Sequence, residues 1–187
     1  MRVRWRHARK PPGPPPVASR RAEAPRILFP FLAPALSRRA LGTALRLARA
    51  EGAVLVPVFL APVPRWLPLD AALPRQAGTA VATQEAIEQR AARLGVPVDA
   101  RLERGRTARH ALLRATACER YERIVVAAAA PGAPGFAPGD VAWLLAHAPG
   151  EIVVMRPGHE DDLLEIEPAA EPDGHGPTVA LPAAFVR

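Results

Sequence analysis

The chain has 187 residues, of which 49% are hydrophobic and 23% charged, and its formal net charge is +7 at pH 7. This length fits one domain with flanking tails, and the single cysteine, Cys118, excludes an intrachain disulfide and a cysteine-based zinc cluster. Lysine occurs once among the 25 Lys and Arg residues, so we attribute the arginine excess to coding bias and do not expect nucleic acid as a partner.

Charge of opposite sign gathers at the two ends of the chain. Residues 1–25 hold seven Arg and Lys against one Glu, and residues 158–187 hold seven acidic residues against one Arg. Both segments lack hydrophobic periodicity and are predicted to be disordered tails, which leaves 26–157 as the folded domain. One helical turn within the acidic tail is expected at Leu163, Leu164 and Ile166. No apolar run is long enough for a membrane span and no signal peptide is evident, so we expect a cytoplasmic protein.

The first half of the domain alternates apolar strands with amphipathic helices. Strands are predicted over 26–31 (RILFPF) and 53–60 (AVLVPVFL), and the second is apolar throughout, as in a strand covered on both faces. Helices are predicted over 34–50 and 75–94. Their inward stripes are expected to be Leu36, Ala40, Ala44, Leu47 and Ala48 in the first helix, and Val81, Ile87, Ala91 and Leu94 in the second.

The second half continues the same alternation. It is predicted to contain a strand over 96–102, a helix from Thr107 to about Arg120, a strand over 124–128, a helix over 140–147 and a strand over 151–155. Pro97 favours an edge position for the first of these strands, and Thr107 is expected to cap its helix. The inward side chains of that helix are expected to be Leu112, Leu113 and Thr116. This order predicts right-handed crossovers and a parallel sheet, and therefore an α/β fold.

Three stretches of the domain share features with a known family: RILFPF with the following SRRALGTALRLARAEGAVLVPVFL, then LERGRTARHALL, then GDVAWLLAHAPGEIVVMRP. They resemble the universal stress protein family. The resemblance implies a Rossmann-like three-layer sandwich of the adenine nucleotide alpha hydrolase type, with a five-stranded parallel sheet in the order 3-2-1-4-5. It also implies a stress-response protein that often dimerises. The apolar last strand, IVVM at 152–155, is the expected homodimer edge, since an unpaired edge invites pairing.

The same resemblance places a nucleotide-binding motif on residues that depart from it. Nucleotide-binding members of the family use an aspartate after the first strand and a loop of the form Gly-x2-Gly-x9-Gly-Ser/Thr after the fourth. Here these positions fall on Leu32, Ala127, Ala130, Gly139 and Asp140. Leucine offers no acceptor to ribose, alanine restricts the backbone where phosphate must approach closely, and a carboxylate repels phosphate. We expect a non-enzymatic binding module with no catalytic residues, no metal, and weakened or lost ATP binding.

Two alternatives remain open. Gly132 and Gly135 preserve a Gly-x2-Gly spacing shifted by five residues, and with Gly139 they are candidates for a genuine ATP loop, although Pro131, Pro134 and Pro138 remove N–H donors from it. Four arginines at the turn into the third helix, at positions 101, 104, 106 and 109, are expected at the ligand edge of the sheet and would meet an anion there. The second alternative is that the basic tail binds nucleic acid or an anionic surface.

Overall fold

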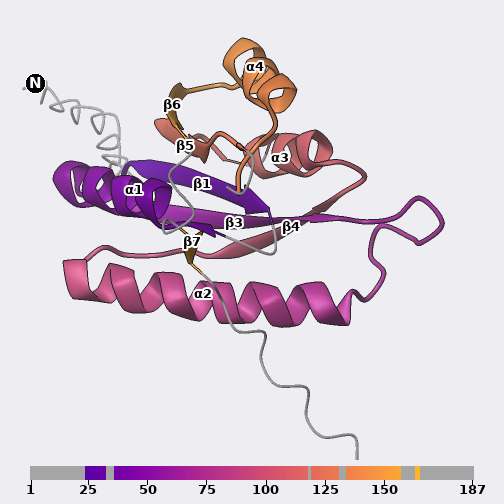
Figure 1. Ribbon diagram of the computed structural model, residues 1–187. Coiled ribbons are helices and arrows are strands. Elements are labelled where there is room, and N and C mark those ends of the chain that lie inside the picture. Colours follow the sequence, from indigo (N-terminus) through magenta and orange to yellow (C-terminus); the bar gives the residue numbers. More distant parts are fainter. Residues whose placement is uncertain (1–23, 33–35, 118, 131–133, 157–162, 165–187) are drawn as a thin grey trace, which may run out of the picture.

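A computed structural model of the chain shows a three-layer α/β sandwich (Figure 1). It describes residues 24–32, 36–117, 119–130, 134–156 and 163–164. The tails predicted to be disordered therefore lie outside the described residues, except at 24–25 and 163–164, and so do Cys118 and Gly132.

The central sheet has five parallel strands in the order β4-β3-β1-β5-β6. The strands are β1 (Arg26–Leu32), β3 (Val54–Pro62), β4 (Arg101–Gly105), β5 (Arg123–Ala127) and β6 (Glu151–Met155). The α/β class and the five-stranded parallel sheet are confirmed. The labels differ from the expected 3-2-1-4-5 because a short strand, β2 (Leu36–Ser37), lies outside this sheet and takes a number.

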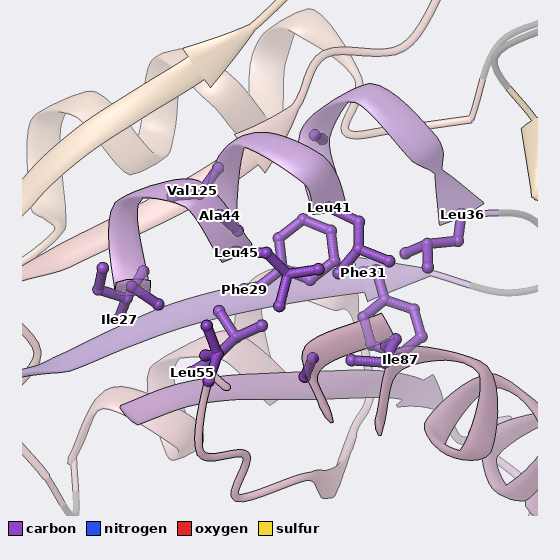
Figure 2. Packing of buried hydrophobic residues seen from close by; sticks show 14 of the residues in the cluster. Ile27, Phe29, Phe31, Leu36, Leu41, Ala44, Leu45, Leu55, Ile87 and Val125 are labelled. Atoms are coloured by element: carbon purple, nitrogen blue, oxygen red, sulfur yellow. The ribbon is translucent and has the colours of Figure 1, made fainter. Parts of the chain in front are cut away.

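Two pairs of helices cover the two faces of the sheet (Figure 1). They are α1 (Arg38–Glu51) and α2 (Pro74–Leu94) on one face, and α3 (Ala108–Ala117) and α4 (Pro138–His147) on the other. Successive side chains of a strand point to opposite faces. In β1, accordingly, Phe29 and Phe31 pack with α1 and α2 (Figure 2), whereas Leu28 packs with α3 and α4.

The first helix begins later than predicted. It starts at Arg38 rather than residue 34, because the Ser37 hydroxyl accepts a hydrogen bond from the Ala40 amide at 3.2 Å and caps the helix there. Leu36 and Ser37 instead form β2, which pairs with β7 (Leu163–Leu164). The helical turn predicted around Leu163 is therefore wrong, since that dipeptide is extended.

Several other predicted boundaries and faces are wrong. The strand expected over 96–102 is β4, which begins at Arg101, and Val98 forms only an isolated bridge with Leu55. The helix expected to reach Arg120 ends at Ala117. Two side chains expected inward are exposed, Val81 by 55% and Leu113 by 49%. The buried faces are formed by Thr83, Ile87 and Ala91 in α2, and by Ala111, Leu112 and Ala115 in α3.

Candidate functional site

The candidate site lies at the carboxyl edge of the sheet, where β1 and β5 diverge. In parallel sheets ligands bind at such a topological switch, between strands whose connections run in opposite directions. β1 pairs with β3 along its whole length but with β5 at only two positions, Ile27 against Arg123 and Leu28 against Ile124. Leu32 and Ala127, both half-buried, end the two strands on either side of this divergence.

The loop that follows β5 folds back onto the end of its own strand. The Ala129 amide donates to the Phe136 carbonyl and the Phe136 amide donates to the Ala127 carbonyl, each at 2.8 Å. The Ala128 amide donates to the Met155 carbonyl of β6 at 2.9 Å. The Phe136 side chain is 2% exposed and belongs to the core between the sheet and α3 and α4. These three amides are therefore committed to carbonyls of the chain itself.

Gly135 serves this internal contact. A Cβ atom at this position would lie 2.5 Å from the Ala127 oxygen and 2.6 Å from the Ala128 carbonyl carbon, closer than real Cβ contacts allow. Glycine is required because two backbone segments touch here, which is a different reason from the approach of a phosphate. Ala130 is half-buried beside this contact, and Gly132, the other member of the shifted glycine pair, lies outside the described residues.

The start of α4 holds the last two predicted site residues. The helix begins at Pro138, two residues before the predicted start, and Ala137 occupies the N-cap without a side-chain hydrogen bond. Gly139 is exposed in the first turn. Asp140 is also in the first turn rather than at the cap, and there its negative charge interacts favourably with the helix dipole.

Arg109 of α3 joins this helix start from the neighbouring element. Its Nε donates to Asp140 Oδ1 at 2.6 Å, and its guanidinium carbon lies 5.9 Å from the centre of the Trp143 ring. The Trp143 ring in turn stacks on His147 with 5.0 Å between ring centres. The carboxylate of Asp140 thus stands near the positive end of α4 and is already paired with a cation.

The four arginines predicted to meet an anion do not converge. Arg109 binds Asp140, whereas Arg106 donates to the carbonyl oxygens of Pro64 at 2.6 Å and Leu67 at 2.8 Å, and so holds the loop after β3. Arg101 starts β4 and therefore lies at the opposite, amino edge of the sheet. The expectation of a shared anion site is wrong because these residues span a whole strand and the first turn of a helix.

An ion-pair cluster at the amino edge of the sheet was not predicted from the sequence. Arg101 binds Asp99 and Glu119, both at 2.7 Å, and Arg26 binds the same two carboxylates. The hydrogen bond from Arg101 holds the pKa of Asp99 below its ordinary value, although partial burial acts in the other direction. Sequence separations of up to 93 residues hide such a cluster from any local pattern, and only the alternation of charge near strand starts could have suggested it.

A recess of about 750 Å³ lies beside this cluster, lined by Thr116, Ala117, Glu119, Arg120, Tyr121, Glu122 and Pro149. It opens at the amino ends of β5 and β6, so it is not the expected ligand edge. Burial there raises the pKa of the Tyr121 phenol.

Within the described residues, no group of three or more His, Cys, Asp or Glu side chains is placed to hold a metal ion. Among the described helices, none combines the length and apolarity required to cross a membrane.

The comparison with family models identifies one family. A family model described as "Universal stress protein family" matches residues 24–156. The comparison with curated proteins finds no match. Among solved structures, the chain is similar to a universal stress protein from Archaeoglobus fulgidus, with a TM-score of 0.53 and 14% identity over 70% of this chain and 92% of that one.

Two further solved structures share the fold. One is UspA from Lactobacillus plantarum, with a TM-score of 0.52 and 18% identity over 72% of this chain and 99% of that one. The other is a universal stress protein family protein from Arabidopsis thaliana with AMP bound, with a TM-score of 0.53 and 12% identity over 73% of this chain and 94% of that one.

Proposed function

Because this chain belongs to the universal stress protein family, we propose that it is a non-enzymatic binding module in which internal contacts have replaced the grip on ATP phosphates. It keeps the sheet and the helices that frame the carboxyl edge. The residues at that edge differ from those of the family's nucleotide-binding motif. Their backbone and charged groups bind one another.

One observation carries this proposal: three of the backbone donors described after β5 are already used. Phosphate sites of this type depend on N–H groups that point at the ligand. Here the amides of Ala128, Ala129 and Phe136 donate to carbonyl oxygens of the same fold. A phosphate could take them only if the buried Phe136 left its place in the core.

The Arg109–Asp140 pair supports the same conclusion. A helix start favours negative charge, and Asp140 supplies it from within the chain. Arg109, the cation that an incoming phosphate would need, is bound to that carboxylate at 2.6 Å. A second anion at this place would meet the charge of Asp140 at close range, and Leu32 offers no side-chain acceptor to a ribose.

Calorimetry of the full chain with magnesium-ATP tests the proposal. We expect no saturable heat at millimolar nucleotide for the natural chain. In Asp140→Ser the internal anion is removed and Arg109 is released, so weak binding of ATP is expected to appear; Asp140→Glu, which keeps the charge, is the matched control. Micromolar binding by the natural chain would overturn the proposal.

Binding of that strength would favour the second candidate, a genuine nucleotide-binding protein that uses Gly132, Gly135 and Gly139. The Arabidopsis protein, which has the same fold and was solved with AMP bound, supports this candidate. It predicts that Gly132→Ala and Gly139→Ala weaken binding. A third possibility, an anionic partner of the basic tail, predicts a salt-sensitive gel shift that is lost when residues 1–25 are removed.

A second copy of this chain is the partner that we propose for the folded domain. β6 lies at an outer edge of the sheet, and Val154 on it is 38% exposed. The neighbouring helix α4 presents Leu145, which is 62% exposed. An apolar strand with a free edge tends to pair with another strand.

The substitution Val154→Lys tests this partner. A lysine on each copy places like charges on the paired edges, so the protein is expected to become monomeric in light scattering at tens of micromolar. Val81→Lys, on the exposed face of α2, is the matched control and should leave the oligomeric state unchanged. A natural chain that is strictly monomeric at the same concentration would contradict this proposal.

A further inference from the structure

A second recess, which we call the edge recess, lies along the outer edge of β4. It has a volume of about 350 Å³ and is lined by Leu69, Asp70, Leu102, Glu103, Arg104 and Arg114. Side chains from both faces of β4 line it, because β4 is an outer strand and no described strand pairs with its free edge. β3 and β1 separate β4 from β5, and the edge recess shares no residue with the candidate site at the ends of β1 and β5.

Arg104 brings an unsatisfied hydrogen-bond donor to the edge recess. Its side chain is half-buried, and its Nε is shielded from solvent but has no acceptor in the described part of the chain. The other two charged atoms in this state, Arg26 Nε and Glu119 Oε2, lie 3.1 Å apart and compensate each other. Arg104 has no such carboxylate. A buried donor without an acceptor is costly and uncommon, and an acceptor on a ligand would remove that cost.

Asp70 brings the opposite charge to the same recess. It is exposed, and it forms no ion pair among the residues that the structure describes. The loop that carries it is fixed by Arg106, which donates to the carbonyl oxygens of Pro64 and Leu67. Asp70 and Arg104 thus line one recess with opposite charges, yet they lie too far apart to bind each other.

The other lining residues add a compensated pair of charges and an apolar wall. Arg114 Nε lies 3.7 Å from Glu103 Oε2, so these two charges balance each other. Leu69 and Leu102 are half-buried and give the lining its apolar part. One cation and one anion therefore remain without a partner, with apolar side chains in the same lining.

We propose that the edge recess binds a small aliphatic zwitterion, a free amino acid whose charged ends are separated by a few methylene groups. The carboxylate of the ligand accepts the hydrogen bond of Arg104 Nε, since a guanidinium matches a carboxylate in geometry and charge. The ammonium group of the ligand pairs with Asp70, and its methylene groups contact Leu69 and Leu102. A simple anion would leave Asp70 without a partner. The volume lies at the lower end of the range for small-molecule sites, about 300–1,000 Å³.

Amide NMR of the full chain with a series of probes tests this proposal. The amino acids are glycine, 4-aminobutyrate and 6-aminohexanoate at millimolar concentration and neutral pH, with butyrate and butylammonium as analogues that carry one charge. Saturable shifts are expected for residues 69–70 and 102–105, with the tightest binding by an amino acid longer than glycine, whose ends reach both Asp70 and Arg104. Each analogue satisfies one end only and is expected to bind at least about tenfold more weakly.

Arg104→Met separates binding from folding. Methionine keeps part of the apolar stem and removes the unsatisfied donor, so binding is expected to weaken at least about tenfold while the melting temperature stays equal or rises. Asp70→Asn is expected to weaken the amino acids to the level of butyrate and to leave butyrate itself unchanged. Arg65→Gln and Glu85→Gln change exposed charges outside the edge recess, so they are the matched controls and should keep the binding.

The proposal is wrong if butyrate binds as tightly as the amino acids, because Asp70 then takes no part. It is equally wrong if no probe gives saturable shifts at the residues of the edge recess. A loss of stability in Arg104→Met would contradict it as well, since the guanidinium would then already serve the chain itself. Binding of ATP at the candidate site changes none of these outcomes, because the two places share no residue.

Discussion

Replacing Phe136 with alanine is expected to lower the free energy of unfolding by about 3–5 kcal/mol, the usual cost of removing a buried phenylalanine. The side chain is 2% exposed and packs in the core with Val126, Leu112 and Leu144. It also holds the loop after β5 against its strand, through the two backbone hydrogen bonds of residue 136. Urea denaturation gives the change in stability.

Hydrogen exchange adds a local readout to that measurement. The amides of Ala129 and of residue 136 are expected to exchange faster in the Phe136→Ala protein, because the loop loses its anchor in the core. Trp66→Ala is the matched control, since Trp66 is 83% exposed and its removal should change stability by no more than about 0.5 kcal/mol. Equal stability of the two variants would show that Phe136 does not anchor the loop.

The second large effect is expected at the turn from β4 into α3. A Cβ atom on Gly105 would lie 2.3 Å from the Ala111 nitrogen and 2.8 Å from its Cα, both of which are backbone atoms that cannot rotate away. The substitution Gly105→Ala therefore forces α3 away from the sheet, at a cost of about 1–3 kcal/mol as in other overpacked cores. Thermal and urea denaturation both measure this loss.

Gly78→Ala is the matched control for that substitution. Gly78 lies within α2, and an added Cβ would meet nothing within 4 Å. Alanine loses less backbone entropy in a helix than glycine, so this variant is expected to gain about 0.5–1 kcal/mol. A Gly105→Ala protein as stable as the natural chain would show that α3 moves at no cost.

Apart from β4, whose start was predicted five residues too early, the sequence predicts the strands of this fold better than the faces of its helices. Runs such as 53–60 are apolar throughout and leave little doubt that the strand is buried on both sides. In α1 the predicted stripe misses Leu41 and Leu45, both in the core, because a helix between a sheet and α2 buries a wider arc than one stripe. The exposed Val81 shows the converse, since apolarity alone does not place a residue inside.

The candidate site was predictable only in part. The resemblance to the family correctly placed Leu32 at the end of the first strand, and Gly139 and Asp140 near the start of the last helix. It could not show that Phe136 fills the core or that Asp140 is bound by Arg109, because both depend on how α3 and α4 pack. Comparison with a motif shows which residues differ from it. The contacts that those residues make instead are visible only in the folded structure.

The two outer edges of the sheet differ in chemistry, and in the proposed dimer this difference would limit the growth of the assembly. β4 carries Arg101, Glu103 and Arg104, charges that discourage further strands, whereas β6 is apolar from Ile152 to Met155. When two copies join through β6, the combined sheet presents a charged β4 at each end. An assembly of that kind would close at two copies and would not extend into the open-ended fibres that a sheet with two apolar free edges would form.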